Sequence, residues 1–235
     1  MIERTLFSSE HEAFRDSFRK FVEKEISPFH AEWEEQGYVA REVWNKAGEN
    51  GFLCMSMPEQ YGGSEADNLA LRGVLAASRR RGRHLVVSAV EHHAVLDPAE
   101  DLERAGLAEV TIVGVDRDGR VDPAAIEAAI REDTVLVSVM HANNEIGAVN
   151  DIAEIARRVR ARNPHTMVHT DAVQSAAHLG VHVDRLGVDL MTFTAHKLYG
   201  PRGAGALYVR AGTPVQGQIL GGGQERGVRA GTEDT

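Results

Sequence analysis

Short apolar runs alternate with amphipathic helical patterns through the chain from about Leu85 onward. Apolar residues three and four positions apart mark helical segments such as 123–131 and 152–162. The apolar runs are 85–87, 110–113, 135–139, 167–169 and 190–193. Strands spaced by helices are typical of βαβ units and a mostly parallel sheet. The pattern therefore predicts an α/β fold, in which ligands bind at the carboxyl ends of the strands.

The first 60 or so residues show helical patterns and none of the alternation typical of strands. Ser9 and Glu12 form a capping box at a helix start. One apolar helical face follows, made of Phe14, Phe18, Phe21 and Val22. Pro28 ends this helix, because the residue before a proline avoids the α region. A second helical stretch covers about 41–49, so these residues predict a short all-helical segment.

Composition and charge limit the classes of function. The formal net charge of −9 argues against a nucleic acid as the main partner, and the basic run 78–83 is interpreted as a solvated helix end and turn. A single cysteine, Cys54, leaves no intramolecular disulfide and no cysteine-based metal site, which fits a reducing compartment. No apolar run approaches the ~20 residues of a membrane span, and the N-terminus lacks the apolar part of a signal peptide. We expect a cytoplasmic protein with no metal, membrane or nucleic-acid partner.

Two residues with chemically versatile side chains stand at the ends of apolar runs. Lys197 follows the run 190–193 and precedes a glycine-rich segment. A partly desolvated lysine can form a Schiff base with an aldehyde cofactor, although a lysine in a loop is more often a solvated charge. Asp171 ends another run and can hold a pyridine nitrogen protonated, or it can simply N-cap the helix that follows.

Two more polar segments follow apolar runs. The amides Asn143 and Asn144 come after the run that ends at Met140; they can hydrogen-bond a phenolic oxygen or form an Asx turn. His92 comes after the run that ends near Val90 and can stack on a flat ring or serve as a structural histidine. Each signal is weak by itself. The order of these segments along the sequence is more informative, because the carboxyl ends of parallel strands share one edge of a sheet.

In this order, the segments resemble the cysteine desulfurases, the class V aminotransferase-like branch of the fold-type I pyridoxal phosphate enzymes. The resemblance covers about 170 residues, from Ser64 to Thr232. The matching segments are 62–68, 91–96, 143–147, 171–175, 195–201 and 221–227. The resemblance implies the mostly parallel sheet of the large domain of these transferases, pyridoxal 5'-phosphate as cofactor, and a homodimer that shares its active sites.

The resemblance also assigns roles to nine residues. Lys197 would form the Schiff base, Asp171 would face the pyridine nitrogen, and His92 would stack on the ring and take part in proton transfer. The remaining cofactor contacts would be Asn144 and Gln174 near the phenolic oxygen, Ser64, Thr194 and His196 at the phosphate, and Thr232 at the phosphate of the partner subunit. A Gly-Gly turn that opens a helix at Ser64 also offers free N–H groups to an anion. The implied reaction converts L-cysteine, or a similar amino acid, to alanine and passes sulfur to an acceptor protein, as in iron–sulfur cluster biogenesis.

The start of the chain resembles another family, the N-terminal helical domain of the acyl-CoA dehydrogenases, nearest the long-chain type. The matching segments are 6–12, 43–48 and 58–63. The chain thus resembles a mosaic that changes family at Gly62-Gly63, and we expect a helical segment over 1–63 and a cofactor-binding core over 64–235. No dehydrogenase site residue is carried over, because the flavin contacts and the catalytic glutamate of that family come later in its sequence.

Three features depart from the desulfurase pattern. Pro58 argues against a central strand just before the Gly-Gly turn. The sequence ends at Thr235, where the small domain with the substrate-carboxylate arginine and the nucleophilic cysteine would follow in the family. Cys54 is expected to pack as a small hydrophobe. We therefore expect a truncated, catalytically incomplete desulfurase-like protein; the alternatives are a non-catalytic mosaic or interaction protein and an acyl-CoA dehydrogenase remnant.

Overall fold

A computed structural model of the 235-residue chain describes residues 16–17, 19–36, 63–200 and 202–231. The chain divides into two compact units, Met1–Met57 and Pro58–Thr235. In the first unit, a π-helix η1 (Val22–Ile26) and the helix α2 (His30–Gln36) are separated by a turn. The helical prediction agrees with this part of the first unit. Cys54, Pro58 and the predicted helix at 41–49 lie outside the described residues.

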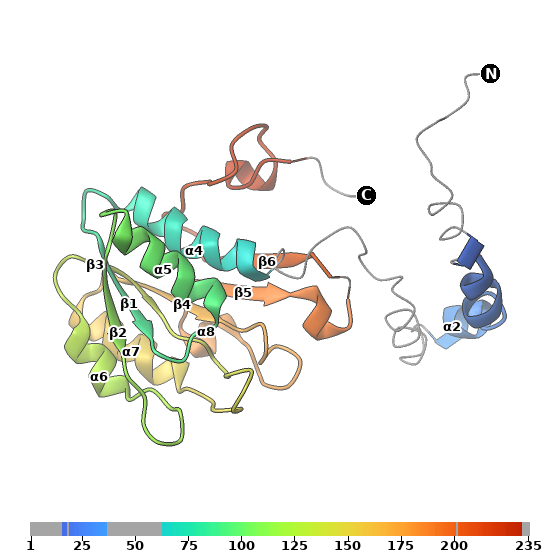
Figure 1. Ribbon diagram of the computed structural model, residues 1–235, viewed down its shortest axis with the longest axis horizontal. Helices are drawn as coiled ribbons and strands as arrows, with labels where there is room; N and C mark the ends of the chain where they lie inside the picture. The colour runs from blue at the N-terminus through green and yellow to red at the C-terminus, as the bar shows by residue number, and fades with distance from the viewer. Residues whose placement is uncertain (1–15, 18, 37–62, 201, 232–235) are drawn as a thin grey trace. The chain divides into compact units, whose positions relative to one another are not determined.

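A six-stranded sheet forms the centre of the second unit (Figure 1). Its strands are β1 (His84–Ser88), β2 (Glu109–Val113), β3 (Thr134–Ser138), β4 (Met167–Asp171), β5 (Leu190–Thr194) and β6 (Gly205–Val209). The order is β2-β1-β3-β4-β5-β6, with parallel pairing throughout except between β5 and β6, which are antiparallel. The predicted α/β fold with a mostly parallel sheet is confirmed. Each predicted apolar run coincides with one of β1 to β5, whereas β6 was not predicted because it follows a glycine-rich segment.

Helices cover both faces of this sheet. The longer ones are α4 (Gly63–Ala77), α5 (His93–Arg104), α6 (Pro123–Ala129) and α7 (Ile152–Arg162), and α8 (Val183–Leu186) adds one turn. In Figure 1, α4 and α5 lie side by side on one face, while α6 and α7 lie on the other. Aspartate side chains cap two of these helices: Asp122 accepts from the backbone N–H of Ala124 before α6, and Asp151 accepts from that of Glu154 before α7.

The core has one apolar cluster on each side of the sheet. Val86 of β1 belongs to the cluster with Ile126 and Ile155 of the helices α6 and α7. Its neighbour Leu85 belongs to the other cluster, with Leu71 of α4 and Val95 of α5. Successive strand side chains point to opposite faces, and both faces here are covered. For this reason the strands appear in the sequence as continuous apolar runs rather than as alternating patterns.

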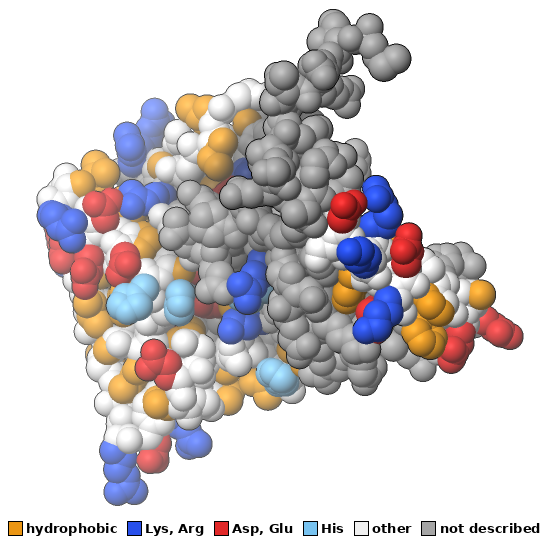
Figure 2. All heavy atoms as spheres, turned by 45° about the vertical axis from the view of Figure 1, so that its right-hand side comes forward, with side chains coloured by type: hydrophobic (Ala, Val, Ile, Leu, Met, Phe, Trp, Pro, Cys, Tyr) orange, Lys and Arg blue, Asp and Glu red, His pale blue; other side chains and the backbone are white. Residues whose placement is uncertain are grey.

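Charged side chains of both signs are interspersed on the face shown in Figure 2. The arginines of the basic run lie exposed at the turn that follows α4. Arg83 pairs with Glu109 at 2.8 Å, and Arg72 of α4 pairs with Asp101 at 2.7 Å. Within the described ranges, no helix combines the length and the apolar character that crossing a bilayer requires.

Candidate functional site

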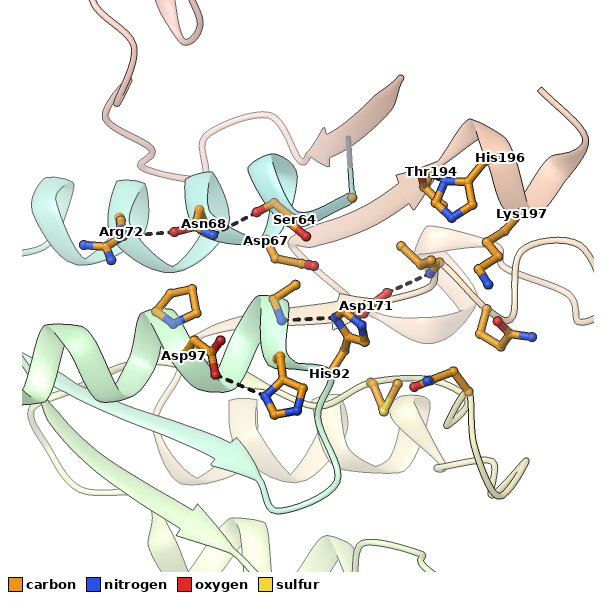
Figure 3. Close-up of a pocket in the computed structure, with 18 of the residues that line it drawn as sticks. Ser64, Asp67, Asn68, Arg72, His92, Asp97, Asp171, Thr194, His196 and Lys197 are labelled. Carbon is orange, nitrogen blue, oxygen red and sulfur yellow. Dashed lines mark hydrogen bonds and ion pairs between the residues drawn. The ribbon is translucent and has the colours of Figure 1, made fainter. Parts of the chain in front are cut away.

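The carboxyl ends of β1, β3, β4 and β5 meet at a cavity of about 720 Å³, beside the starts of α4 and α5 (Figure 3). Eight of the nine predicted site residues line it: Ser64, His92, Asn144, Asp171, Gln174, Thr194, His196 and Lys197. Thr232, the ninth, lies outside the described residues. The described part of the chain holds no group of three His, Cys, Asp or Glu side chains placed to bind a metal ion.

Lys197 lies in a short 3₁₀ helix, η2 (Ala195–Leu198), directly after β5. The backbone reverses behind it: Tyr199 has a φ of 64°, and the N–H of Gly200 donates to the carbonyl of Ala195 at 2.8 Å. A Cβ at position 200 would approach the Cβ of Ala195 to 2.9 Å, so this tight turn requires glycine. The turn returns the chain toward β6 and leaves the lysine side chain at the cavity wall.

Polar groups around the start of α4 form one end of the cavity. Gly63 begins this 15-residue helix, and Ser64 lines the cavity beside it. Thr194, the last residue of β5, contacts His196 through Oγ1 and Nδ1 at 2.9 Å. A Cβ on Gly63 would lie 3.5 Å from the Cβ of Thr194, so the helix start packs closely on the strand end. The first N–H groups of a helix lack intrahelical partners, and hydroxyl groups beside them complete a suitable anion site.

Asp171, the last residue of β4, is only 4% exposed. Its Oδ1 accepts from the backbone N–H of Val173 at 2.8 Å, so it caps the turn that follows the strand while it also lines the cavity. Burial raises the pKa of this carboxyl, whereas the Val173 N–H and the nearby His92 favour its charged form. The alternative in which Asp171 N-caps a following helix is wrong, because turns and no helix follow it, whereas Asp171 does line the cavity.

The two neighbouring amides after β3 take different places. Asn143 makes an Asx turn: its side-chain oxygen accepts from the N–H of Glu145 at 2.9 Å and of Ile146 at 3.0 Å. Its side-chain nitrogen donates to the carbonyl of Val90 at 3.0 Å, which ties this loop to the loop after β1. Asn144 lines the cavity. The structure thus assigns the turn to Asn143 and places Asn144 at the cavity.

His92 is the N-cap of α5, and its Nδ1 accepts from the backbone N–H of Ala94 at 3.1 Å. This bond leaves Nε2 as the ring atom that can hold or release a proton. His93 follows edge-on, with 6.3 Å between the ring centroids, and its Nδ1 lies 3.2 Å from Asp97 Oδ1. The structural interpretation of His92 and the functional one are compatible, since capping orients a ring that lines the cavity.

Two buried carboxyl groups at this site were missed from the sequence. Asp67 lines the cavity from α4 and is 1% exposed. Glu91, just before His92, accepts a short hydrogen bond from Ser88 Oγ and a bond of 2.7 Å from the N–H of Met140. A signal for Asp67 existed, because it stands three residues after Ser64 on one helix and so shares its face. Nothing in the sequence indicates the burial of Glu91.

Comparisons with known families agree with both parts of the sequence analysis. Residues 61–232 match the family model of the class-V aminotransferases. Residues 8–111 match that of the acyl-CoA dehydrogenase N-terminal domain, so the two matches overlap over 61–111, from α4 into β2. The chain is thus a mosaic of sequences similar to two families, as the sequence analysis predicted.

Individual relatives point to the desulfurase branch. The cysteine desulfurase IscS of Dictyoglomus turgidum is 50% identical over 173 residues, which are 74% of this chain and 43% of that protein. The IscS of Azotobacter vinelandii is 51% identical over 173 residues, 73% of this chain and 42% of that one. The chain therefore spans less than half the length of these curated relatives.

Solved structures share the fold. A NifS-like protein has a TM-score of 0.71 and 37% identity, over 81% of this chain and 53% of the other. SspA, solved in complex with cysteine, has a TM-score of 0.69 and 32% identity, over 91% of this chain and 65% of the other. The α/β fold, the family match over 61–232 and these relatives lead to one assignment. The chain belongs to the class-V aminotransferase family.

Proposed function

We propose that this chain binds pyridoxal 5'-phosphate in the cavity at the sheet edge and serves as the cofactor-binding core of a cysteine desulfurase. The observation that supports this most is convergence. Eight side chains of the types that such a cofactor needs, drawn from α4 and from the ends of four strands, line one cavity. L-cysteine or a similar amino acid is the proposed substrate, since the relatives at about 50% identity are cysteine desulfurases.

The residues present fit the chemical groups of this cofactor. Ser64, Thr194 and His196, together with the start of α4, suit the phosphate. Asp171 is a buried carboxyl that can face a protonated ring nitrogen, and Lys197 supplies an amine for the aldehyde carbon. Amide groups of Asn144 and Gln174 are available to the phenolic oxygen, and the His92 ring is available to the ring face.

When bound, pyridoxal phosphate supplies a conjugated ring that accepts the electron pair left at the α-carbon of an amino acid. The protein's part is to hold charge and to move protons. Asp171 would keep the ring nitrogen protonated, because a carboxylate in a buried site favours a nearby cation. His92 would exchange protons through Nε2, since its Nδ1 is occupied by the N–H of Ala94. Lys197 would hold the cofactor through its side-chain amine.

Sulfur transfer needs a further group, a thiolate that reaches the substrate sulfur. Cys54 is the one cysteine among these 235 residues, and it belongs to the dehydrogenase-like segment proposed over 1–63. We therefore propose that these residues bind cofactor and substrate amine without completing sulfur transfer to an acceptor protein. Thr232 is proposed to reach the phosphate site of a second copy, which would make the functional unit a homodimer.

The cofactor proposal is tested by labelling the lysine. Purified protein is mixed with pyridoxal phosphate, reduced with borohydride, digested and mapped by mass spectrometry. The chain has four lysines, Lys20, Lys24, Lys46 and Lys197, so the outcome is easily assigned. We expect the reduced adduct on Lys197, which is the only lysine in the α/β core.

The control variant is Lys197→Arg, which keeps the positive charge but has no primary amine for the aldehyde. It should lose the adduct and keep the fold, as judged by circular dichroism. Label spread over the other three lysines, or equal label in the Lys197→Arg variant, would contradict the proposal and favour a non-catalytic role for the chain.

A further inference from the structure

Asp67 is a buried carboxyl that the proposed function does not use. It belongs to the first turns of α4, its side chain is 1% exposed, and it lines the same cavity as Asp171 (Figure 3). Its Oδ1 has no hydrogen-bond partner. In the described part of the chain, Asp67 forms no ion pair with a lysine or an arginine. A carboxylate so placed would be expensive to leave charged.

The polar groups behind Asp67 form a directed hydrogen-bond chain. His169 of β4 is fully buried, and its Nδ1 and Nε2 contact Ser138 Oγ at 2.9 Å and Thr192 Oγ1 at 3.0 Å. The hydroxyl of Thr192 lowers the pKa of the Asp67 carboxyl, but less than burial and Asp171 raise it. If Thr192 donates to Asp67, it must accept from Nε2 of His169, and Ser138 must then donate to Nδ1. The printed hydrogen bonds therefore run from Ser138 through His169 to the neutral hydroxyl of Thr192 and include no cation.

The imidazole of His169 does not supply a positive charge next to Asp67. Its Nε2 lies 3.6 Å from Asp67 Oδ1, which is too long for a hydrogen bond. Burial lowers the pKa of His169 to about 3, so the ring is neutral near pH 7. The remaining titratable groups that act on Asp67 are Asp171 and Glu91, and both are carboxyls.

We propose that Asp67 is a positioning residue that holds a proton beside Asp171, so that Asp171 is the single anion on this wall of the cavity. Two carboxyls that share a low-dielectric site cannot both ionise easily, and their surroundings decide which one keeps the proton. Asp171 has the donor N–H of Val173 at 2.8 Å and the nearby ring of His92. Asp67 has an unpartnered oxygen, and the buried ring of His169, 3.6 Å from it, brings no positive charge.

Two physical arguments agree with this assignment. Burial, followed by the repulsion from Asp171, raises the pKa of Asp67 well above its ordinary value. A charged Asp67 would repel Asp171 in turn and promote its protonation, and Asp171 could then no longer hold a cationic ring nitrogen. The functional consequence rests on the proposed cofactor site, whereas the protonation state of Asp67 is a property of the chain without any ligand.

Carboxyl NMR of the cofactor-free protein tests this directly. Aspartate is labelled with ¹³C at Cγ, whose chemical shift reports protonation, and spectra are recorded from about pH 5 to pH 8. We expect one resonance to stay at the protonated position above the pH at which an ordinary aspartate ionises, to vanish in Asp67→Asn and to persist in Asp97→Asn. Asp97 is the matched control, because it lines the same cavity but its side chain is 71% exposed.

The Asp171 resonance, assigned with Asp171→Asn, should stay at the carboxylate position both in the wild type and in Asp67→Asn. If Asp67→Asn does not fold, Thr192→Val serves instead; it removes the hydroxyl that acts on Asp67 and should move the protonated resonance. An Asp67 resonance at the carboxylate position already at pH 5, or an Asp171 resonance at the protonated position there, overturns the proposal. Failure of the cofactor proposal would appear differently, as absent label on Lys197 with an unchanged carboxyl spectrum.

Discussion

Glu91 immediately precedes His92 and links this loop to two strands of the sheet. Its carboxyl accepts from Ser88 at the end of β1 and from the N–H of Met140 after β3. Despite these two donors, burial raises its pKa to about 8, and one of its oxygens has no partner. Near neutral pH, the folded chain therefore holds a proton at Glu91 that the unfolded chain releases.

This proton makes the free energy of unfolding depend on pH, and Glu91→Gln should remove its contribution to that dependence. The folded pKa of about 8 lies above the ordinary value of 4.5, so the folded state binds more protons between these limits. Stability contributed by the wild-type residue is therefore complete below about pH 4.5 and is lost as the pH rises toward 8. A pKa unit corresponds to about 1.4 kcal/mol. Between pH 5 and pH 8, the free energy of unfolding of the variant should therefore rise by a few kcal/mol relative to that of the wild type.

Urea unfolding at several pH values measures this difference. Other groups that titrate, such as His84 and His141, are present in both proteins and cancel in the comparison. Glu145→Gln, on an exposed loop, is the control and should give a curve parallel to the wild type. Parallel curves for Glu91→Gln would show that Glu91 is charged in the folded protein.

At the scale of elements, α4 connects the cavity with the segment that follows β6. The helix begins at the cavity with Gly63 and packs along its length against α5, β5 and β6. At Gly73 the backbone of residue 216 crosses the helix, and the N–H of Gln216 donates to the carbonyl of Gly73 at 3.0 Å. A Cβ at position 73 would meet Val215 Cγ1 at 2.8 Å and the carbonyl oxygen of Gln216 at 2.9 Å.

Gly73→Ala should therefore destabilise the protein, although alanine favours a helix over glycine by about 1 kcal/mol. One of the two close atoms belongs to backbone, so overpacking should outweigh propensity and lower the free energy of unfolding by about 1–3 kcal/mol. Urea unfolding followed by circular dichroism measures the change. Gly114→Ala is the control, since nothing lies within 4 Å of its added Cβ and its stability should stay close to the wild type. A Gly73→Ala variant more stable than the wild type would contradict this account of the crossing.

At the scale of the whole molecule, the chain joins two family patterns within a single sequence. The change of family predicted at residue 63 stays a prediction, and the second compact unit begins nearby, at Pro58. Since α4 begins at Gly63 and contributes to the core beneath the cavity, the α/β part starts with an element that both the fold and the site require.

The predicted homodimer also concerns the whole molecule. The segment 221–231 resembles one that serves a neighbouring subunit, and just before it Ile219 and Leu220 are 44% and 82% exposed. Light scattering should give about twice the chain mass of 25.6 kDa. Leu220→Glu should shift the protein toward monomer because it places a charge in the proposed interface, whereas Leu107→Glu, between α5 and β2, should not. A wild-type monomer that binds the cofactor tightly would reject the shared site.

Much of this protein follows from the sequence alone. Apolar runs and helical periodicity predicted β1 to β5 and the helices α6 and α7, because burial on two faces leaves a local pattern of side chains. The position of Lys197, Asp171, Asn144 and His92 after these runs also predicted one shared edge, because parallel strands end together. Such features depend on neighbours along the chain, which a sequence records directly.

Only the tertiary structure decided which polar groups are buried and what they contact. The antiparallel strand β6 pairs with β5 through residues that carry little strand signal. Asn143 and Asn144 are adjacent and chemically identical, yet contacts with Val90, 53 residues away, direct one into a turn while the other lines the cavity. The charge states of Asp67 and Glu91 depend on Thr192, Met140 and Asp171, which are remote in the sequence. Desolvation and repulsion act through space, so no local pattern of residues determines them.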